Sequence, residues 1–313
     1  MKSNFKIIAF ILGIAFIAVI SYLLNVGVFQ HKVSTNTANK KLQVTASFYP
    51  MYFFASQIGR DKADVMSITP AAAEPHDYEP TTQDVVRINQ SNMLVLNGGK
   101  LEPWGDKIKD ELQGTNVLIV TAGNGLANKQ LNENGQTIQD PHIWLDPVLA
   151  KKEVAVIEQG FEKIDPADKA YFQTNAKKLE NDLDKLDAEY KTGLSSCQKK
   201  DFVTSHAAFG YLAATYGINQ IAISGVSPDE EPSSQKLAEV ANLVKQKDIK
   251  IIFFESLVSP KLSETIASET GAKTMVLDPI EGITSNDLKA GHTYLTAMRD
   301  NLAALQDALQ CKK

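Results

Sequence analysis

The stretch Thr69–Thr81 reads TPAAAEPHDYEPT and follows an apolar run, Val65–Ile68, that predicts a buried strand. Three prolines restrict the backbone around them, so this loop is stiff. A helical pattern begins at Thr82. One imidazole, His76, lies in the middle of the loop among acidic neighbours. A histidine held at a strand exit is well placed to bind a metal ion, although a single histidine is more often a solvated or packed side chain.

The same arrangement recurs along the chain. A strand is predicted over Asn116–Thr121, and after the polar loop Ala122–Gln139 comes DPHIWLDP, which contains His142. His206 follows the predicted strand Asp201–Thr204. Asp278 follows the predicted strand Lys273–Leu277 and precedes a proline.

Ligands of open α/β sheets bind outside the carboxyl ends of the strands. If two such sheets face each other at those ends, the four side chains converge on one cleft. We therefore predict a metal site built from His76, His142, His206 and Asp278. The two remaining histidines, His31 and His292, are interpreted as solvated surface residues.

Strand and helix patterns alternate through most of the chain, which predicts an α/β fold with parallel sheets covered by helices. We expect an N-terminal α/β lobe over 42–147, connecting helices over 148–193 and a C-terminal α/β lobe over 194–313. After Pro166, the chain up to Thr192 contains neither glycine nor proline, and three leucines share one helical face. It predicts a long, stiff helix that joins the lobes.

The N-terminus carries a charge-free, largely apolar run, Ile7–Phe29, after two lysines. About 20 apolar residues suffice to span a bilayer. Residues 1–30 are therefore expected to be an export signal or an uncleaved membrane anchor, the alternative being a buried core helix. Residues 31–41 are polar and predict a flexible tether. The absence of a following cysteine argues against a lipid anchor, and the body of the protein is expected outside the cytoplasmic membrane.

Export also bears on the two cysteines, Cys197 and Cys311. A pair of cysteines in an exported protein suggests a disulfide, and two unpaired thiols are the alternative. A bridge between them would fix the C-terminus to the start of the second lobe.

Composition excludes several classes of function. The 313 residues are 43% hydrophobic and 22% charged, with a formal net charge of -5. No basic cluster is present, so nucleic acid is not an expected partner. Neither G-x-G-x-x-G nor GK[ST] occurs, which argues against a phosphate-binding loop.

Several separated motifs resemble one family. EPHDYEP, DPHIWLDP, TSHAAFGY, the acidic turn before Ser233, FFE and LDPI occur in the order found in the zinc and manganese solute-binding receptors of bacterial ABC importers, called cluster A-I. The resemblance runs from about Leu42 to Gln310. It implies two α/β lobes joined by a rigid helix, with the metal between them, and it places the family's ligands on His76, His142, His206 and Asp278. Many zinc receptors of the family carry a histidine-rich loop before the second ligand, whereas Ala122–Gln139 contains no histidine.

We therefore expect a monomeric, non-enzymatic receptor that captures a divalent cation and delivers it to a membrane permease with its ATPase. Three imidazoles and one carboxylate favour Zn²⁺ over Mn²⁺, which prefers oxygen ligands. A manganese receptor of the same family is the nearest alternative. A metallohydrolase would keep one coordination position for water, which makes Asp278 the discriminating residue. An adhesin or other surface interaction protein is a further alternative.

Overall fold

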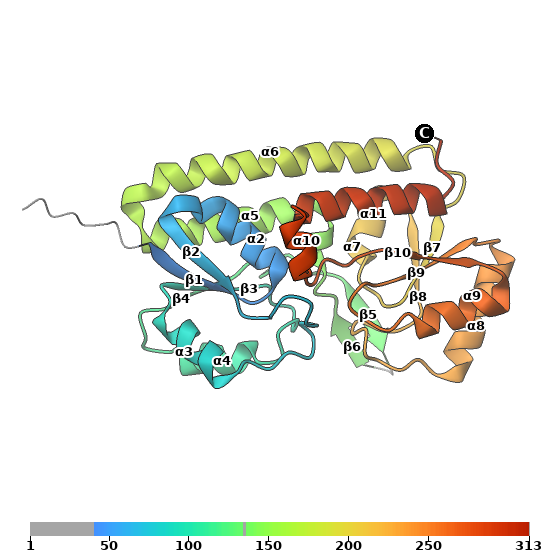
Figure 1. The fold of residues 1–313 in the computed structure, drawn as a ribbon, viewed down its shortest axis with the longest axis horizontal. Coiled ribbons are helices and arrows are strands. Elements are labelled where there is room, and N and C mark those ends of the chain that lie inside the picture. The colour runs from blue at the N-terminus through green and yellow to red at the C-terminus, as the bar shows by residue number, and fades with distance from the viewer. Residues whose placement is uncertain (1–40, 134–135, 313) are drawn as a thin grey trace, which may run out of the picture. The chain divides into compact units, whose positions relative to one another are not determined.

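Two four-stranded parallel sheets form the framework of the computed structural model, which describes residues 41–133 and 136–312 (Figure 1). The first sheet has the order β2-β1-β3-β4, and the second has the order β10-β9-β7-β8. Every pairing within the two sheets is parallel, as predicted. The first sheet contains β1 (Leu42–Ala46), β2 (Ala63–Ser67), β3 (Met93–Leu96) and β4 (Leu118–Thr121). The second contains β7 (Asp201–Thr204), β8 (Asn219–Ala222), β9 (Ile251–Phe254) and β10 (Lys273–Val276).

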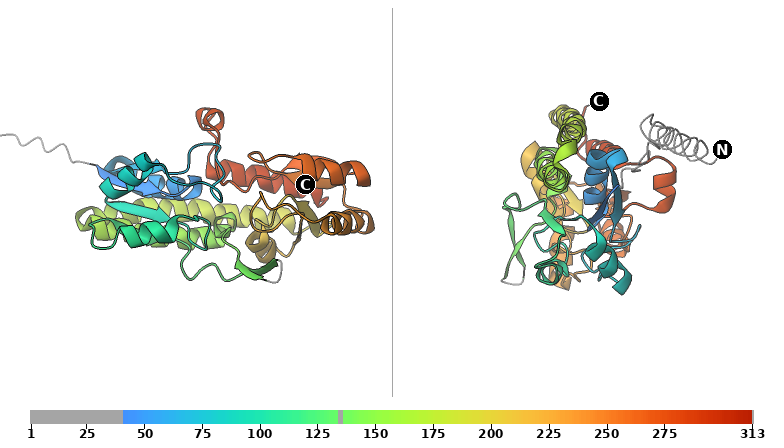
Figure 2. Two further views of the ribbon diagram at one scale, coloured as in Figure 1. Left: turned by 90° about the horizontal axis from the view of Figure 1, so that it is seen from below. Right: turned by 90° about the vertical axis from the view of Figure 1, so that its left-hand side faces the viewer.

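Helices connect the strands and cover the sheets, which confirms the predicted α/β class. Those before β7 are α2 (Tyr49–Gly59), α3 (Thr82–Gln90), α4 (Gly105–Glu111), α5 (Pro147–Ile164) and α6 (Lys169–Leu194). Those after it are α7 (Gly210–Tyr216), α8 (Ser234–Gln246), α9 (Lys261–Thr270), α10 (Ser285–Lys289) and α11 (Tyr294–Ala308). The short α10 stands out from the body in Figure 2 and was not predicted.

Local chemistry sets where the helices beside the site begin. Thr81 and Asp84 form a reciprocal capping box at the start of α3, so the loop that carries His76 ends at a fixed point. Asp146 caps α5 by accepting from the Val148 N–H, and Pro147 occupies the first turn, where a missing N–H costs least. The segment that carries His142 is therefore held directly at the start of α5.

The long helix α6 runs past both sheets beside α11 (Figure 1). Its 26 residues correspond to a length of about 39 Å at 1.5 Å per residue. It begins at Lys169 instead of Pro166 because residues Pro166–Asp168 form a tighter 3-10 turn. The predicted leucine face is buried, and Tyr190 donates from its hydroxyl to the Met298 carbonyl of α11 (2.6 Å).

One hydrophobic cluster extends from the first sheet to the second. It includes Phe54 of α2, Leu183 of α6, Phe253 of β9 and Tyr294 of α11. The Tyr294 ring packs edge-on against Phe54 at 5.0 Å between ring centres. Residues Lys41–Lys313 form a single compact unit, and the lobe boundaries expected from the sequence remain predictions.

An antiparallel hairpin, β5 (Gln130–Glu133) and β6 (Gln136–Gln139), lies where the sequence predicted only a polar loop. Leu131 and Ile138 are the only apolar residues of these two strands, and they lie opposite each other. So little apolar periodicity gives no strand signal. The backbone N–H of Lys129, just before the hairpin, donates to the Tyr211 hydroxyl of α7 (2.9 Å), which ties this segment to the second half of the chain.

The structure joins Cys197 to Cys311 by a disulfide. The two residues also form an isolated antiparallel bridge, and the Lys199 N–H donates to the Leu309 carbonyl (3.0 Å). The disulfide therefore links the segment after α6 to the segment after α11.

The predicted signal or anchor, residues 1–30, and nearly all of the tether lie outside the described residues. Among residues 41–133 and 136–312, no helix combines the length and the apolar character needed to cross a membrane.

A carboxyl group is buried in the interior of the first half. Glu153 of α5 is fully buried, and within the described part of the chain neither of its carboxylate oxygens has a hydrogen-bond partner. Burial, with a smaller effect from Glu102, raises the pKa of Glu153 well above its usual value. An unpartnered carboxyl in such a place is stable only when it is neutral.

Replacing Glu153 by leucine is therefore expected to stabilise the protein at neutral pH. The folded state holds a proton that the unfolded chain releases above about pH 4.3, so stability falls as the pH rises from there toward the raised folded pKa. We expect Glu153→Leu to increase the free energy of unfolding by about 1–3 kcal/mol at pH 8 and by less at pH 5. Urea unfolding at both pH values measures this, with the exposed Glu239→Leu as control; an equal difference at the two pH values would contradict it.

Candidate metal centre

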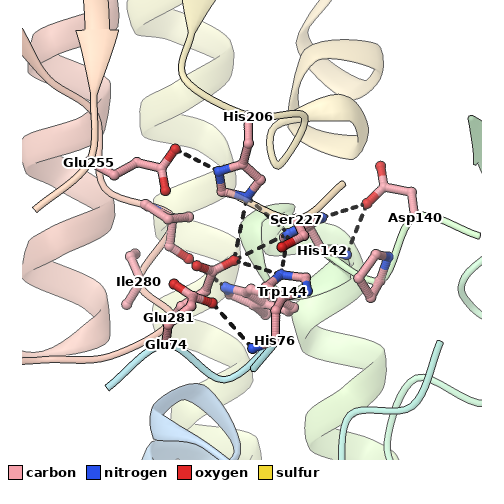
Figure 3. Close-up of polar contacts among 12 residues, drawn as sticks. Glu74, His76, Asp140, His142, Trp144, His206, Ser227, Glu255, Ile280 and Glu281 are labelled. Atoms are coloured by element: carbon pink, nitrogen blue, oxygen red, sulfur yellow. Dashed lines mark hydrogen bonds and ion pairs between the residues drawn. The ribbon is translucent and has the colours of Figure 1, made fainter. Parts of the chain in front are cut away.

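Three imidazoles and one carboxylate converge between the two sheets (Figure 3). His76 comes from the loop between β2 and α3, His142 from the segment before α5, and His206 from the end of β7. The fourth group is Glu281, from the loop after β10. One possible ligand atom from each residue lies within 4.8 Å of the others.

The spacing of these atoms matches a tetrahedral site. Nε2 of His142 is 3.3 Å from Nε2 of His76 and 3.2 Å from Nε2 of His206. Glu281 Oε1 is 3.3, 3.2 and 3.5 Å from the Nε2 atoms of His76, His142 and His206. A tetrahedron with ligand distances of 2.0–2.1 Å has edges of roughly 3.3–3.4 Å. Five of the six edges of the site thus have the length that a tetrahedral zinc ion requires.

The group is almost completely removed from solvent. The side chains of His142 and His206 are 0% exposed, that of Glu281 is 1% exposed and that of His76 is 7% exposed. His76, which lies on the loop, is therefore the ligand candidate nearest to solvent. Burial of four polar groups so close together is unfavourable unless they pair with one another or bind a common partner.

Two further carboxylates fix the orientation of the imidazoles. His142 Nδ1 lies 2.8 Å from Asp140 Oδ1, and His206 Nδ1 lies 2.5 Å from Glu255 Oε1 (Figure 3). A carboxylate can only accept here, so each Nδ1 carries a proton, and Nε2 of the neutral ring is then free to bind a metal ion. Glu255 also accepts from the Ser205 hydroxyl, which holds its own position.

The charge of each group in this centre depends on its neighbours. Burial disfavours the imidazolium form, yet the Glu255 and Glu281 carboxylates outweigh it and raise the pKa of His206. At His76, burial prevails and lowers the pKa. Burial opposes ionisation of Glu281 as well, but hydrogen bonds from the three histidines hold its pKa well below the usual value. Glu281 is thus ionised, as a metal ligand must be.

The structure brings together three of the four residues expected from the sequence and replaces the fourth. Asp278 is not in the group: its Oδ1 accepts from the Ile280 N–H (2.7 Å) and its Oδ2 from the Ser256 hydroxyl (2.8 Å). Glu281, three residues later, takes the expected place. The sequence does show that Glu281 is an acidic residue in the loop after a predicted strand. Asp278 was predicted instead because it lies closer to the end of that strand. His292 lies outside the group.

The acidic neighbours of His76 differ in their positions. Glu74 Oε1 accepts from the His76 N–H (3.2 Å), and burial together with Glu281 raises the pKa of Glu74 to about 9. Asp77 is exposed and shares a hydrogen bond with Asp229 of the second half, which raises the pKa of Asp77 to about 6. Glu79 is an exposed loop residue. Only Glu74 therefore belongs to the immediate surroundings of the centre.

We expect Glu255→Ala to weaken metal binding although Glu255 lies outside the four converging groups. Without this acceptor the His206 ring loses the contact that fixes its tautomer and its orientation, and removal of such a partner typically costs 10–100-fold in metal affinity. Competition titration against a chromogenic chelator measures the change. Glu264→Ala, which removes an exposed glutamate on α9, is the matched control; equal affinities of the two variants would refute the role of Glu255.

Comparisons with known proteins agree with this geometry. The family model described as zinc-uptake complex component A, periplasmic, matches residues 44–308. The chain is 39% identical over 292 residues to the high-affinity zinc uptake system protein ZnuA of Bacillus subtilis, covering 90% of this chain and 92% of that protein. It is 37% identical over 289 residues to the zinc-binding protein AdcA of Streptococcus pyogenes, covering 86% of this chain but only 56% of AdcA.

Solved structures give the same result. The Zn(II)-bound ZnuA-like domain of Streptococcus pneumoniae AdcA superposes with a TM-score of 0.75 at 40% identity, covering 86% of this chain and 99% of that one. The laminin-binding protein Lmb of Streptococcus agalactiae, described as both adhesin and metal transporter, gives a TM-score of 0.78 at 35% identity, covering 86% and 100%. The match over nearly all described residues confirms the resemblance found in the sequence motifs: the chain belongs to the family of periplasmic zinc-uptake components.

Proposed function

We propose that this protein is an extracytoplasmic receptor that binds one Zn²⁺ ion through His76, His142, His206 and Glu281. The observation that carries the proposal is that five of the six separations among the three Nε2 atoms and the Glu281 oxygen are 3.2–3.5 Å. The names of the B. subtilis and S. pyogenes relatives support the choice of zinc.

The donor set supports zinc over manganese and binding over catalysis. Three nitrogen donors and one carboxylate suit Zn²⁺, whereas Mn²⁺ prefers sites richer in oxygen. Four protein ligands close a tetrahedral shell, while catalytic zinc sites keep one position for water. A closed shell therefore fits an ion that is held rather than one that activates water. The four side chains are only 0–7% exposed, which supports retention of the ion until a partner opens the site.

The partner we propose is the membrane permease of an ABC importer, with its ATPase. This assignment rests on membership of the zinc-uptake family. The apolar N-terminal run would keep the receptor at the outer face of the cytoplasmic membrane or direct its export.

Metal titration of the purified full chain tests this function. After chelator treatment, the protein should bind one equivalent of Zn²⁺ tightly and Mn²⁺ more weakly, and a strain lacking the protein should take up less zinc from zinc-poor medium. Absence of zinc binding, or preference for Mn²⁺, would overturn the assignment; normal uptake in the deletion strain would overturn the receptor role alone.

A further inference from the structure

The residue before Glu281 has an unusual backbone conformation. Ile280 has φ of +58°, in the left-handed region that a β-branched residue rarely adopts. Its side chain is 1% exposed and belongs to the main hydrophobic cluster. Because this conformation is unfavourable for isoleucine, contacts elsewhere must hold it in place.

Asp278 supplies the most direct of these contacts. Its Oδ1 accepts from the Ile280 N–H at 2.7 Å, which closes a tight turn one residue before Glu281. The Ser256 hydroxyl, at the end of β9, donates to the other carboxylate oxygen at 2.8 Å. The carboxylate thus connects the neighbouring strand to the turn and lies close to the metal centre without entering it.

The backbone of Asp278 is held by α11. Asn301 accepts from the Asp278 N–H (2.9 Å) through Oδ1 and donates to the Asp278 carbonyl (2.6 Å) through Nδ2. Both hydrogen-bonding groups of the residue are therefore paired with one buried asparagine. Next along the chain, the Pro279 carbonyl accepts from Trp144 Nε1 at 2.8 Å.

Trp144 connects this turn to the other half of the site. It lies two residues after His142, its side chain is fully buried, and its ring is 5.2 Å from that imidazole. The Trp144 carbonyl accepts from the Tyr294 hydroxyl of α11 (2.5 Å). The turn Asp278–Glu281 is consequently fixed on both sides by groups that also position His142 or belong to α11.

We propose that Asp278 is a positioning residue for metal binding: its carboxylate holds Ile280 in the left-handed turn and so places Glu281 among the three histidines. This inference rests on the proposed zinc-binding function and adds a residue to it. It also gives Asp278, which sequence patterns suggest as a ligand, a different and indirect role.

Two substitutions separate positioning from ligation. Asp278→Asn keeps an Oδ1 acceptor for the Ile280 N–H, whereas Asp278→Ala removes it. We expect Asp278→Ala to lower zinc affinity by about 10–100-fold and Asp278→Asn by less than about threefold. The Co²⁺-loaded Asp278→Ala protein should show the altered d–d spectrum of Glu281→Ala, and Co²⁺-loaded Asp278→Asn the wild-type spectrum. Loss of affinity in both Asp278 variants, together with wild-type binding in Glu281→Ala, would make Asp278 the ligand and overturn the proposal.

A metal-free measurement keeps the test independent of the zinc assignment. In apo protein, hydrogen exchange of a peptide covering residues 277–284 should accelerate in Asp278→Ala and stay at the wild-type rate in Asp278→Asn. Asp300→Ala, which removes an exposed aspartate on α11, is the matched control. Unchanged exchange in Asp278→Ala would overturn the positioning role even if the protein bound no zinc, whereas accelerated exchange without zinc binding in the wild type would refute the proposed function only.

Discussion

Substituting alanine for His206 is expected to reduce zinc affinity by at least about 100-fold, which corresponds to about 2.7 kcal/mol. His206 Nε2 lies 3.2 Å from His142 Nε2 and 3.5 Å from Glu281 Oε1, so its removal opens one corner of the tetrahedron. The same change leaves the buried Glu255 carboxylate without its imidazole partner. The decrease in zinc affinity should therefore be larger for His206→Ala than for Glu255→Ala, because Glu255→Ala only disturbs the orientation of the ring.

The measurement is a competition titration with Zn²⁺ and Mn²⁺ after chelator treatment. His292→Ala, which removes an exposed histidine before α11, is the control and should bind zinc like the wild type. His206→Glu replaces a nitrogen donor by oxygen and should shift preference toward Mn²⁺. Wild-type zinc affinity in His206→Ala would show that His206 is no ligand, and the zinc assignment would fail with it.

Loss of the disulfide is expected to have the largest effect on stability. The bridge closes a segment with a sequence separation of 114 residues, and the chain-entropy model gives up to about 4–5 kcal/mol for a loop of that size, with about 2–4 kcal/mol typical. We expect the double variant Cys197→Ser/Cys311→Ser to unfold at a lower denaturant concentration by this margin.

A reductant provides the matched control. It should destabilise the wild type to the level of the double serine variant and leave that variant unchanged. Thiol titration of denatured, non-reduced wild type should find no free cysteine, since the described residues contain none outside this pair. Two reactive thiols in that titration would exclude the bridge in the protein as isolated.

Sequence patterns predicted the framework most directly where a strand is strongly apolar. Met93–Leu96 is buried at every position, and a continuous apolar run of this kind signals a strand in a parallel sheet. The helical pattern predicted from Thr82 is confirmed because the capping box at Thr81 marks the start of α3. The β5–β6 hairpin lacked such signals, since one Leu131–Ile138 pair carries all of its apolar character.

The metal centre was likewise predicted only in part from the sequence. The three histidines were found because each was expected after a strand of a parallel sheet, where ligands bind outside the carboxyl ends of the strands. In the structure the β5–β6 hairpin separates His142 from β4. The prediction of Asp278 instead of Glu281 missed the turn at Ile280, whose φ is positive. A β-branched residue rarely adopts this conformation, so the sequence does not indicate a turn there.

The contact between Glu255 and His206 was not predicted because the two residues are 49 positions apart in the sequence. Asp140 lies only two residues before His142, but sequence spacing alone does not show that its carboxylate contacts Nδ1 of that ring.

The hydrophobic cluster that includes Phe54, Leu183, Phe253 and Tyr294 has a consequence for cooperativity. Each half also has a smaller cluster of its own, one that includes Leu94 and one that includes Ile252. Because both sheets contribute side chains to the large shared cluster, unfolding of one half would expose apolar surface of the other. Heating should therefore produce one calorimetric transition, whose midpoint rises when zinc is bound. A mutation that loosens packing anywhere in this cluster would lower the occupancy of the metal centre, because the ion is lost whenever the whole unit unfolds.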